Sequence, residues 1–385
     1  MNELYHWKEQ FPNKAICIFG ARQIGKTTSL LQFANENFEK VILLNFLTFP
    51  EAKTIFSDSL DPEKIFMQIE LLTKTTIIPK KTMIIFDEIQ ECPNARTAVK
   101  FLVEDGRARI GETGSLLGVR IEGISSIPVG YEMPVSMYPL DFEEFLWGAS
   151  VSDEIIDLLK RSIREKKPIP EFINERRLEY FHQYNVIGGM PEVCQRYFDH
   201  HNFEEAIETQ KTILNTYRND IIQYADRNDR VRILEVFEQI PAQLNKQNLR
   251  FFLNQITGSK NPRFSQYENC LYWITEAGIA LPSFNVEEPQ IPLKLNEKRN
   301  LFRLFFLDTG LLCSNYEGIQ ISLLQGDLSI NWGSILENAV AQSLTAQNIP
   351  LYYFNTKKFG EIDFVCQIDQ HVHLVEIKSG NDYKK

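Results

Sequence analysis

The sequence predicts an α/β fold for the first part of the chain, followed by helices and two smaller α+β regions. Three observations support this prediction. A glycine-rich turn joins an apolar run to a helical pattern near the N-terminus, a second apolar run ends in two acidic residues, and helical periodicity takes over from about residue 152. The predicted parts are an α/β domain over residues 1–147, a helical lid over 148–207, a winged-helix-like part over 208–316 and an α+β tail over 317–385.

The composition is that of a folded protein from a reducing compartment. Of the 385 residues, 43% are hydrophobic, and the net charge of -10 argues against a protein that coats nucleic acid over its whole surface, although a local basic face is compatible with it. The six cysteines lie far apart without a C-x-x-C pair, so neither a zinc site nor a disulfide framework is expected. No signal peptide and no apolar run of about 18 residues occurs. We therefore expect a cytoplasmic protein without a membrane partner.

The glycine-rich turn has the pattern of a phosphate-binding loop. In "KAICIFGARQIGKTT" the pattern G-x-x-x-x-G-K-[ST] follows the apolar run Ala15–Phe19 and precedes a helical pattern. Glycines let backbone N–H groups turn toward phosphates, and the helix N-terminus adds partial positive charge. Lys26 is expected to reach the β- and γ-phosphates of ATP, and Thr27 to offer its hydroxyl to Mg²⁺. The residues expected to bind the nucleotide are Gly20, Ala21, Arg22, Gln23, Ile24, Gly25, Lys26, Thr27 and Thr28.

The second apolar run, Met83–Phe86, ends in Asp87 and Glu88. Downstream of a phosphate-binding loop, Asp87 is expected to bind Mg²⁺ together with Thr27, and Glu88 to polarise the attacking water as a general base. The alternative is an acidic cap on the following helix. A glutamate next to the aspartate favours hydrolysis of ATP over storage of the nucleotide.

Two further strands are predicted. Lys40–Phe46 is expected to lie outside the neighbours of the first strand, and Arg107–Gly118 reads as a strand that ends in Thr113 and Ser115. A hydroxyl at that strand end can bind the γ-phosphate or the attacking water, so Thr113 and Ser115 join Glu88 and Lys26 as candidate catalytic residues. A plain strand-to-loop turn explains the same residues equally well.

The segments "FGARQIGKTT", "MIIFDEIQECPNA", "ETGSLLGV" and "MYPLDFEEFL" together resemble the AAA-type P-loop ATPases that carry a C-terminal DUF4143 region, and the resemblance covers nearly the whole chain. It implies an AAA-type domain with a helical lid and ATP and Mg²⁺ as cofactors. It is also compatible with assembly of the protein into a homo-oligomer. Members often place a basic finger residue before the last of these segments, where this chain has Tyr131. Arg22 and Arg120 are the remaining basic candidates.

The segment after the α/β domain shows two local signals. Asp141 followed by Glu144 predicts a capped helix start after a strand. The glycines and proline of "VIGGMPEV" are typical of a tight connection between helices, and we favour this structural role over contact with nucleotide.

The winged-helix prediction rests on a helix from about Phe264 to Glu276, followed by a hairpin with its tip near Glu287–Gln290. Such a unit suggests DNA, and the candidate phosphate contacts are Lys260, Arg263, Lys298, Arg299 and Arg303. The predicted second helix offers Gln266 and Asn269 but no basic residue, so protein contacts are favoured over sequence-specific DNA recognition.

The tail carries acidic residues and a lysine in the order of a PD-(D/E)xK nuclease core, which it resembles. Glu337 lies on a predicted helix, Asp363 shares a strand face with Glu361, and Glu376 and Lys378 lie on the next strand. Three carboxylates can bind one or two Mg²⁺ ions, and a lysine can steady the attacking water. The alternative is a scaffold. His371 and His373 are expected to be solvated. Because the sequence ends soon after Lys378, we expect this domain to be either truncated or minimal.

Three hypotheses for the function stay open at this point. In the first, ATP binding and hydrolysis control a C-terminal module that binds a protein partner not identified by the sequence. In the second, ATP gates a metal-dependent nuclease that cleaves DNA or RNA. In the third, the protein is a nucleotide-binding regulator with little hydrolysis.

Overall fold

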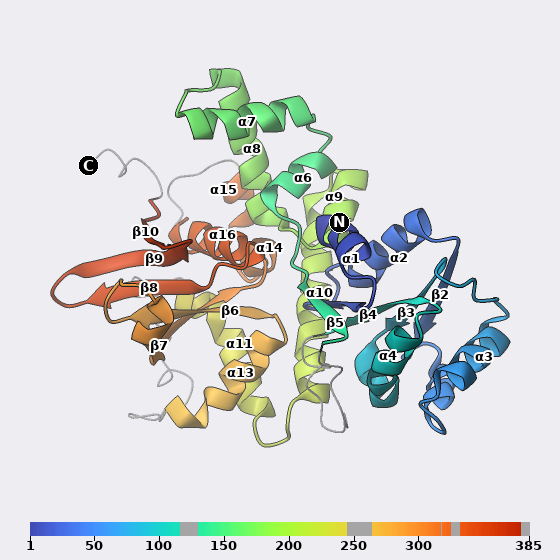
Figure 1. Ribbon diagram of the computed structural model, residues 1–385. Coiled ribbons are helices and arrows are strands. Elements are labelled where there is room, and N and C mark those ends of the chain that lie inside the picture. Colours follow the sequence, from blue (N-terminus) through green and yellow to red (C-terminus); the bar gives the residue numbers. More distant parts are fainter. Residues whose placement is uncertain (116–129, 245–263, 317, 325–331, 379–385) are drawn as a thin grey trace. The chain divides into compact units, whose positions relative to one another are not determined.

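The computed structural model describes residues 1–115, 130–244, 264–316, 318–324 and 332–378. Within it the chain forms two compact units, Met1–Tyr138 and Pro139–Lys385 (Figure 1). No helix in the described ranges is both long enough and apolar enough to cross a bilayer. Each unit is built around its own five-stranded sheet.

The sheet of the first unit is parallel throughout, with the strand order β2-β3-β4-β1-β5. The strands are β1 (Ala15–Phe19), β2 (Lys40–Asn45), β3 (Thr82–Asp87), β4 (Arg109–Gly114) and β5 (Glu132–Ser136). The predicted strand at Lys40–Phe46 is confirmed as an outer strand. Because β4 lies between β1 and β3, the phosphate-binding loop after β1 and the acids after β3 flank the end of β4.

Helices cover both faces of this sheet (Figure 1). They are α1 (Asn2–Gln10), α2 (Lys26–Asn37), α3 (Pro62–Thr73) and α4 (Pro93–Asp105), with two short 3-10 turns, η1 (Pro50–Phe56) and η2 (Ile89–Glu91). Trp7 and Phe33, from α1 and α2, pack with β1 and β3 in one apolar cluster. Phe66 and Leu102, from α3 and α4, pack with β2, β3 and β4 in the other. Burial on both faces explains why these strands read as continuous apolar runs.

The second unit begins with helices. They are α6 (Phe142–Gly148), α7 (Asp153–Glu165), α8 (Glu171–Ile187), α9 (Pro191–His200), α10 (Phe203–Tyr224) and α11 (Arg230–Leu244). The predicted capping box is confirmed, because Asp141 accepts from the N–H of Glu144 at 2.8 Å and the Glu144 carboxylate accepts from the N–H of Asp141 at 3.0 Å. The strand expected directly before it is wrong in extent, since β5 already ends at Ser136.

The remaining elements form the second sheet and its helices. They are η3 (Phe264–Gln266), α13 (Glu268–Glu276), β6 (Ala280–Val286), η4 (Leu293–Asn296), β7 (Glu297–Phe306), α14 (Thr309–Cys313), α15 (Gln320–Leu324), α16 (Gly333–Ala346), β8 (Leu351–Thr356), β9 (Gly360–Ile368) and β10 (His371–Val375). The strand order is β10-β9-β8-β6-β7, in which β6 and β8 are parallel and the other pairs antiparallel.

This second sheet unites two regions that the sequence analysis had kept apart. The hairpin of β6 and β7 exists, with its connection around the predicted tip, but β6 also pairs with β8, so that Ser283 lies opposite Leu351. The hairpin is therefore part of the same sheet as the tail and not a separate wing. Asn338 of α16 fixes the helix to β7 by accepting from the N–H of Phe306 at 2.7 Å and donating to its carbonyl at 3.1 Å.

The "VIGGMPEV" connection between α8 and α9 packs against a buried aspartate. The N–H of Gly189 donates to Asp308 Oδ2 at 2.6 Å. A Cβ at Gly188 would lie 2.1 Å from Asp308 Oδ1, and one at Gly189 would lie 1.9 Å from the carbonyl oxygen of Leu140. Both glycines are thus required by close packing, which accounts for the connection structurally, as predicted. Burial raises the pKa of Asp308 to about 6, against the lowering effect of its N–H donors.

Candidate functional site

The loop between β1 and α2 wraps around the start of the helix. Gly20 and Gly25 have φ angles of +146° and +88°, which L-residues with side chains rarely adopt. A Cβ at Gly20 would also lie 2.3 Å from the carbonyl oxygen of Met137. Only glycine fits this position, and the loop leaves the first N–H groups of α2 without helical acceptors, which is the arrangement that binds phosphate.

Lys26, the first residue of α2, is buried and its amine lies back over the loop. The Nζ atom donates to the carbonyl oxygens of Gly20, at 3.1 Å, and Ala21, at 2.7 Å. Burial lowers the pKa of Lys26 to about 8, and the nearby carboxylates of Glu88 and Asp87 oppose that shift. The amine is therefore held beside the loop and is close to both acids.

Asp87 is the point at which four strand and helix ends meet. Its buried carboxylate accepts from Thr27 Oγ1 at 2.7 Å, from Asn45 Nδ2 at 2.6 Å and from Thr113 Oγ1. The sequence analysis singled out Thr27, Asp87 and Thr113, and the structure brings these three together. Asn45 was not predicted from the sequence, although it ends β2 directly opposite Asp87 in the parallel register.

Glu88 follows Asp87 in a left-handed conformation, with φ at +53°. Its carboxylate accepts a hydrogen bond from the side-chain amide of Gln90, a buried residue that the sequence analysis also missed. Gln90 reaches the end of β4, because a Cβ at Gly114 would lie 2.9 Å from Gln90 Oε1. Glu88 occupies the N-cap position of η2 but makes no side-chain capping bond there, and Cys92 is the N-cap of α4.

The other predicted residues of the site lie around this centre. Ser115 follows the end of β4 and is partly buried, and Arg22 is close enough to Lys26 to lower its pKa. Gln23 and Thr28 are exposed, whereas Ala21 and Ile24 are buried. Arg120 lies outside the described residues. The roles of these residues stay predictions.

Three family models match successive parts of the chain. Residues 12–146 match an AAA domain, residues 178–320 match a domain of unknown function called DUF8612, and residues 332–385 match a domain of unknown function called DUF4143. The chain has an AAA-type P-loop ATPase domain and a C-terminal DUF4143 region. Residues 208–316, the predicted winged-helix-like part, lie wholly within the DUF8612 match.

Solved structures that resemble this AAA-type chain do so weakly. The Orc1 protein of Aeropyrum pernix in complex with DNA is 10% identical with a TM-score of 0.31, over 81% of this chain and 88% of that one. The RuvB Holliday junction branch migration motor of Thermotoga maritima is 11% identical with a TM-score of 0.30, over 73% and 83%. Cdc6p of Pyrobaculum aerophilum is 11% identical with a TM-score of 0.26, over 84% and 91%. No curated protein matches the chain.

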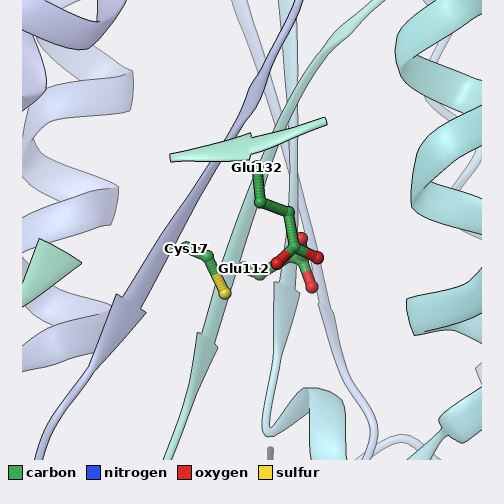
Figure 2. A group of neighbouring side chains, drawn as sticks. All are labelled: Cys17, Glu112 and Glu132. Atoms are coloured by element: carbon green, nitrogen blue, oxygen red, sulfur yellow. The ribbon is translucent and has the colours of Figure 1, made fainter. Parts of the chain in front are cut away.

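A buried charge cluster lies in the AAA domain, on the strands β1, β4 and β5. Arg96 of α4 donates to Glu112 Oε2 and to Glu132 Oε2, both at 2.7 Å, and to Cys17 Sγ at 3.3 Å. Figure 2 shows the two carboxyl groups side by side, with the Cys17 sulfur near them. Glu112 therefore does not face the phosphate site, since strand alternation places it on the opposite face from Thr113.

Burial raises the pKa of both Glu112 and Glu132, which favours the protonated form of these carboxyls, and the guanidinium of Arg96 opposes that shift. One ligand atom from each of Cys17, Glu112 and Glu132 lies within 4.8 Å of the other two, a spacing that a metal ion can span. The guanidinium of Arg96 already supplies the positive charge at this place. We therefore assign the cluster a structural role.

The acidic residues of the DUF4143 region surround a buried arginine. Arg303 on β7 forms an ion pair with Glu361, donates to the carbonyl oxygen of Asp363 at 3.3 Å and lies 3.9 Å from Glu337 Oε2. Its guanidinium also stacks on Tyr353, 4.1 Å from the ring centroid. The prediction that Arg303 contacts DNA phosphates is wrong, because the side chain is fully buried.

The predicted nuclease residues of the tail are neighbours but do not close around one point. Burial, and next the charge of Asp363, raise the pKa of Glu337 to about 8. Asp363 Oδ2 accepts from the N–H of Ile377 at 2.8 Å, and Lys378 pairs with Glu376 at 2.5 Å. Across the described ranges only the Cys17 cluster brings three ligand atoms within 4.8 Å of one another. Glu376 and Lys378 also lie beyond the end of β10, not on it as predicted.

The remaining basic candidates for DNA contact are paired or lie outside the described residues. On the β6–β7 hairpin, Lys298 pairs with Glu287 at 3.1 Å and Arg299 with Glu297 at 2.9 Å. Lys260 and Arg263 fall in a range that is not described. Gln266 and Asn269 are exposed, as are His371 and His373, which were expected to be solvated.

Proposed function

We propose that this chain binds ATP with Mg²⁺, hydrolyses it, and uses the nucleotide state to control a C-terminal module that binds a protein partner. The main support for this proposal is that the carboxylate of Asp87 accepts hydrogen bonds from Thr27, Asn45 and Thr113 close to the amine of Lys26. Donors from separate elements converge here on one acid at the ends of β3 and β4, which is where the AAA domain would place the phosphates.

The residues around Asp87 fit the magnesium ion that such a reaction uses. Mg²⁺ prefers oxygen ligands, and the hydroxyl of Thr27 and the carboxylate of Asp87 lie 2.7 Å apart. These two residues would bind the ion, which neutralises charge on the phosphates. Lys26 would exchange its contacts with Gly20 and Ala21 for contacts with the phosphate oxygens.

Glu88 supports hydrolysis over simple binding. A carboxylate next to the magnesium-binding aspartate can accept a proton from the attacking water. Gln90 holds that carboxylate by its amide, and the charge of Glu88 acts on Lys26. The chain therefore has a candidate base, held in place by a neighbour, within the phosphate site. This supports hydrolysis over a regulator that only binds nucleotide.

Control of a partner is supported by the division of the chain into two compact units, one with the nucleotide site and one with the DUF4143 region. A nuclease gains no support from the tail. There, Arg303 pairs with Glu361 and lies 3.9 Å from Glu337, while Lys378 pairs with Glu376. The nuclease hypothesis stays a prediction without an observation that favours it.

The test compares phosphate release by the wild type, Lys26→Ala and Glu88→Gln, with Mg²⁺ and with EDTA. We expect Mg²⁺-dependent hydrolysis by the wild type and none by Lys26→Ala. We expect Glu88→Gln to bind ATP but to hydrolyse it about 10²- to 10⁴-fold more slowly, as for loss of a general base. Wild-type rates in both variants would overturn the assignment of the site.

Control of the second unit needs a separate measurement. Hydrogen exchange of Glu88→Gln is compared with and without ATP, because this variant should hold the nucleotide without consuming it. We expect changes in exchange at residues beyond Tyr138. Changes confined to the first unit would leave ATP hydrolysis standing and would refute the control of a C-terminal module.

A further inference from the structure

Three adjoining hollows lie on the second unit between α6, α7 and α8, with volumes of roughly 320, 370 and 380 Å³. Leu159 of α7 and Arg177 of α8 line all three. We call these three hollows, together with their rim, the α7–α8 groove. It lies outside the nucleotide site, and every residue that lines it belongs to residues 142–181.

The floor and edges of the α7–α8 groove are apolar. Of the 13 residues of α7, only Ile156 is buried. Ile163 is 74% exposed and Phe172 67% exposed, and both line the groove. A helix with an apolar stripe normally buries that stripe against another element. In the part of the chain that the structure describes, no element covers these side chains.

Basic residues predominate among the charged residues that line the groove, although the protein as a whole carries a net charge of -10 and Lys160, Lys167 and Arg176 pair with neighbouring acids. Six charged residues line the three hollows, and five of them are basic: Lys160, Lys166, Lys167, Arg176, Arg177 and, as the one acid, Glu143. The ion pairs at the rim are exposed, and such pairs contribute little to stability, so a partner can replace them.

Arg177 is the basic residue that all three hollows share. Its Nη2 donates to the neutral Asn174 Oδ1 at 2.7 Å. Its Nε hydrogen is buried and has no hydrogen-bond partner among the described residues. Arg177 lines every hollow, so its guanidinium can pair with an acidic side chain bound in the groove.

We propose that the α7–α8 groove binds an acidic amphipathic helix of a partner protein. Adjoining hollows with apolar linings suit apolar anchors on one helix face, and α7, with 13 residues, offers a contact length of about 20 Å at 1.5 Å per residue. The basic rim selects acidic residues beside those anchors, because opposite charges steer association and like charges repel. This binding does not require ATP hydrolysis and can be measured on its own.

The test uses a pair of synthetic helical peptides of about 15 residues. Both carry Leu and Phe at positions i, i+3, i+4 and i+7; one has Glu and the other Lys at the flanking positions. Binding to the full chain is followed by fluorescence anisotropy. We expect the acidic peptide to bind with micromolar affinity and the basic one at least about tenfold more weakly. Equal binding of the two peptides, or no binding of either, would overturn the proposal.

Variants then locate the binding. Ile163→Glu and Lys166→Glu should each weaken binding of the acidic peptide at least about tenfold, and both sites are exposed, so the fold should tolerate them. Leu71→Glu is the matched control, because Leu71 is 80% exposed on α3 of the first unit, and it should bind as the wild type does. Wild-type affinity in Ile163→Glu refutes the groove as the site.

A lipid surface is the competing occupant. Co-sedimentation with vesicles of phosphatidylglycerol separates the two, since an anionic membrane would also attract a basic, apolar face. We expect no sedimentation at physiological salt. Sedimentation that Ile163→Glu abolishes would assign the groove to membranes and overturn the peptide proposal.

Discussion

Thr113, near the end of β4, donates its hydroxyl hydrogen to the carboxylate of Asp87 at the end of β3. The two residues are 26 positions apart in the chain, and they meet because β3 and β4 are parallel neighbours. The same carboxylate accepts from Asn45 and Thr27. The acid that is expected to bind Mg²⁺ is therefore held from three sides.

Thr113→Val removes one of these donors and keeps the shape of the side chain. We expect the rate of ATP hydrolysis to fall roughly tenfold or more, since a hydrogen bond to a charged group contributes about 1.5–3 kcal/mol. Steady-state phosphate release measures the effect. Thr212→Val on α10, where the hydroxyl only contacts the carbonyl of Glu208, is the control and should hydrolyse normally. A wild-type rate in Thr113→Val would show that the contact does not serve the reaction.

Lys26 predicts a pH dependence of ATP binding. Its pKa is lowered to about 8 in the nucleotide-free protein, so the amine loses its proton as the pH rises through 8. Phosphates favour the protonated amine, so binding takes up a proton and the affinity should fall as the pH increases from 7 to 9.5. Calorimetric titration with a non-hydrolysable ATP analogue tests this. Lys26→Arg, which stays charged, should bind with a smaller decline, and an equal decline would point to another group.

Gly189→Ala should destabilise the second unit. The added Cβ would lie 1.9 Å from the carbonyl oxygen of Leu140, which is backbone and cannot turn away. We expect a loss of about 1–3 kcal/mol in the free energy of unfolding, the usual cost of overpacking, measured by denaturant titration. Gly360→Ala is the comparison, because no atom lies within 4 Å of its Cβ position and only backbone strain at φ +85° remains. Equal losses in both variants would contradict the packing argument.

Glu337 predicts a stability that decreases with pH. Its folded-state pKa is raised to about 8, so the folded protein keeps a proton that the unfolded chain loses above its ordinary value of 4.5. The contribution to stability is therefore full at pH 4.5 and is lost as the pH rises toward 8. Glu337→Gln should melt at a higher temperature than the wild type at pH 9, with a smaller difference at pH 5. A lower melting temperature at pH 9 would mean that the charged form is needed, as in a metal site.

Arg96→Met should unfold the first unit at a lower temperature, because it leaves Glu112 and Glu132 buried without their cation. Removing one partner of a buried ion pair typically costs about 3–5 kcal/mol. We expect Glu112→Gln to cost less, since burial already disfavours the charged form of that carboxyl. Thermal denaturation followed by circular dichroism ranks the two variants. The reverse order of melting temperatures would contradict the view that Arg96 neutralises the buried carboxyl groups of Glu112 and Glu132.

The local parts of the nucleotide site could be predicted from the sequence, because their signals are contiguous. The loop around Lys26 lies between a strand and a helix, and Asp87 ends an apolar run, so each is recognisable alone. Asn45 and Gln90 could not be found in this way. Asn45 acts through its register with β3, and Gln90 through a turn that brings its amide back to Glu88.

The second unit was harder to predict because its sheet depends on distant pairing. Arg303 was predicted to contact DNA phosphates from the wing of a winged helix, but here the strands of the tail bury it and pair it with Glu361. The parallel contact of β6 with β8 carries no local signal either. The helical pattern of α7 could be recognised in the sequence. Only the structure shows that no described element covers its apolar side chains.

The parallel contact of β6 with β8 also sets the order in which this unit can be made. Ser283 of β6 pairs with Leu351 of β8, so this pair can form only after α14, α15 and α16 have been synthesised. On the ribosome, the nascent chain therefore carries β6 with one open edge until the last strands leave the exit tunnel. During translation, that open edge is exposed to pairing with other chains.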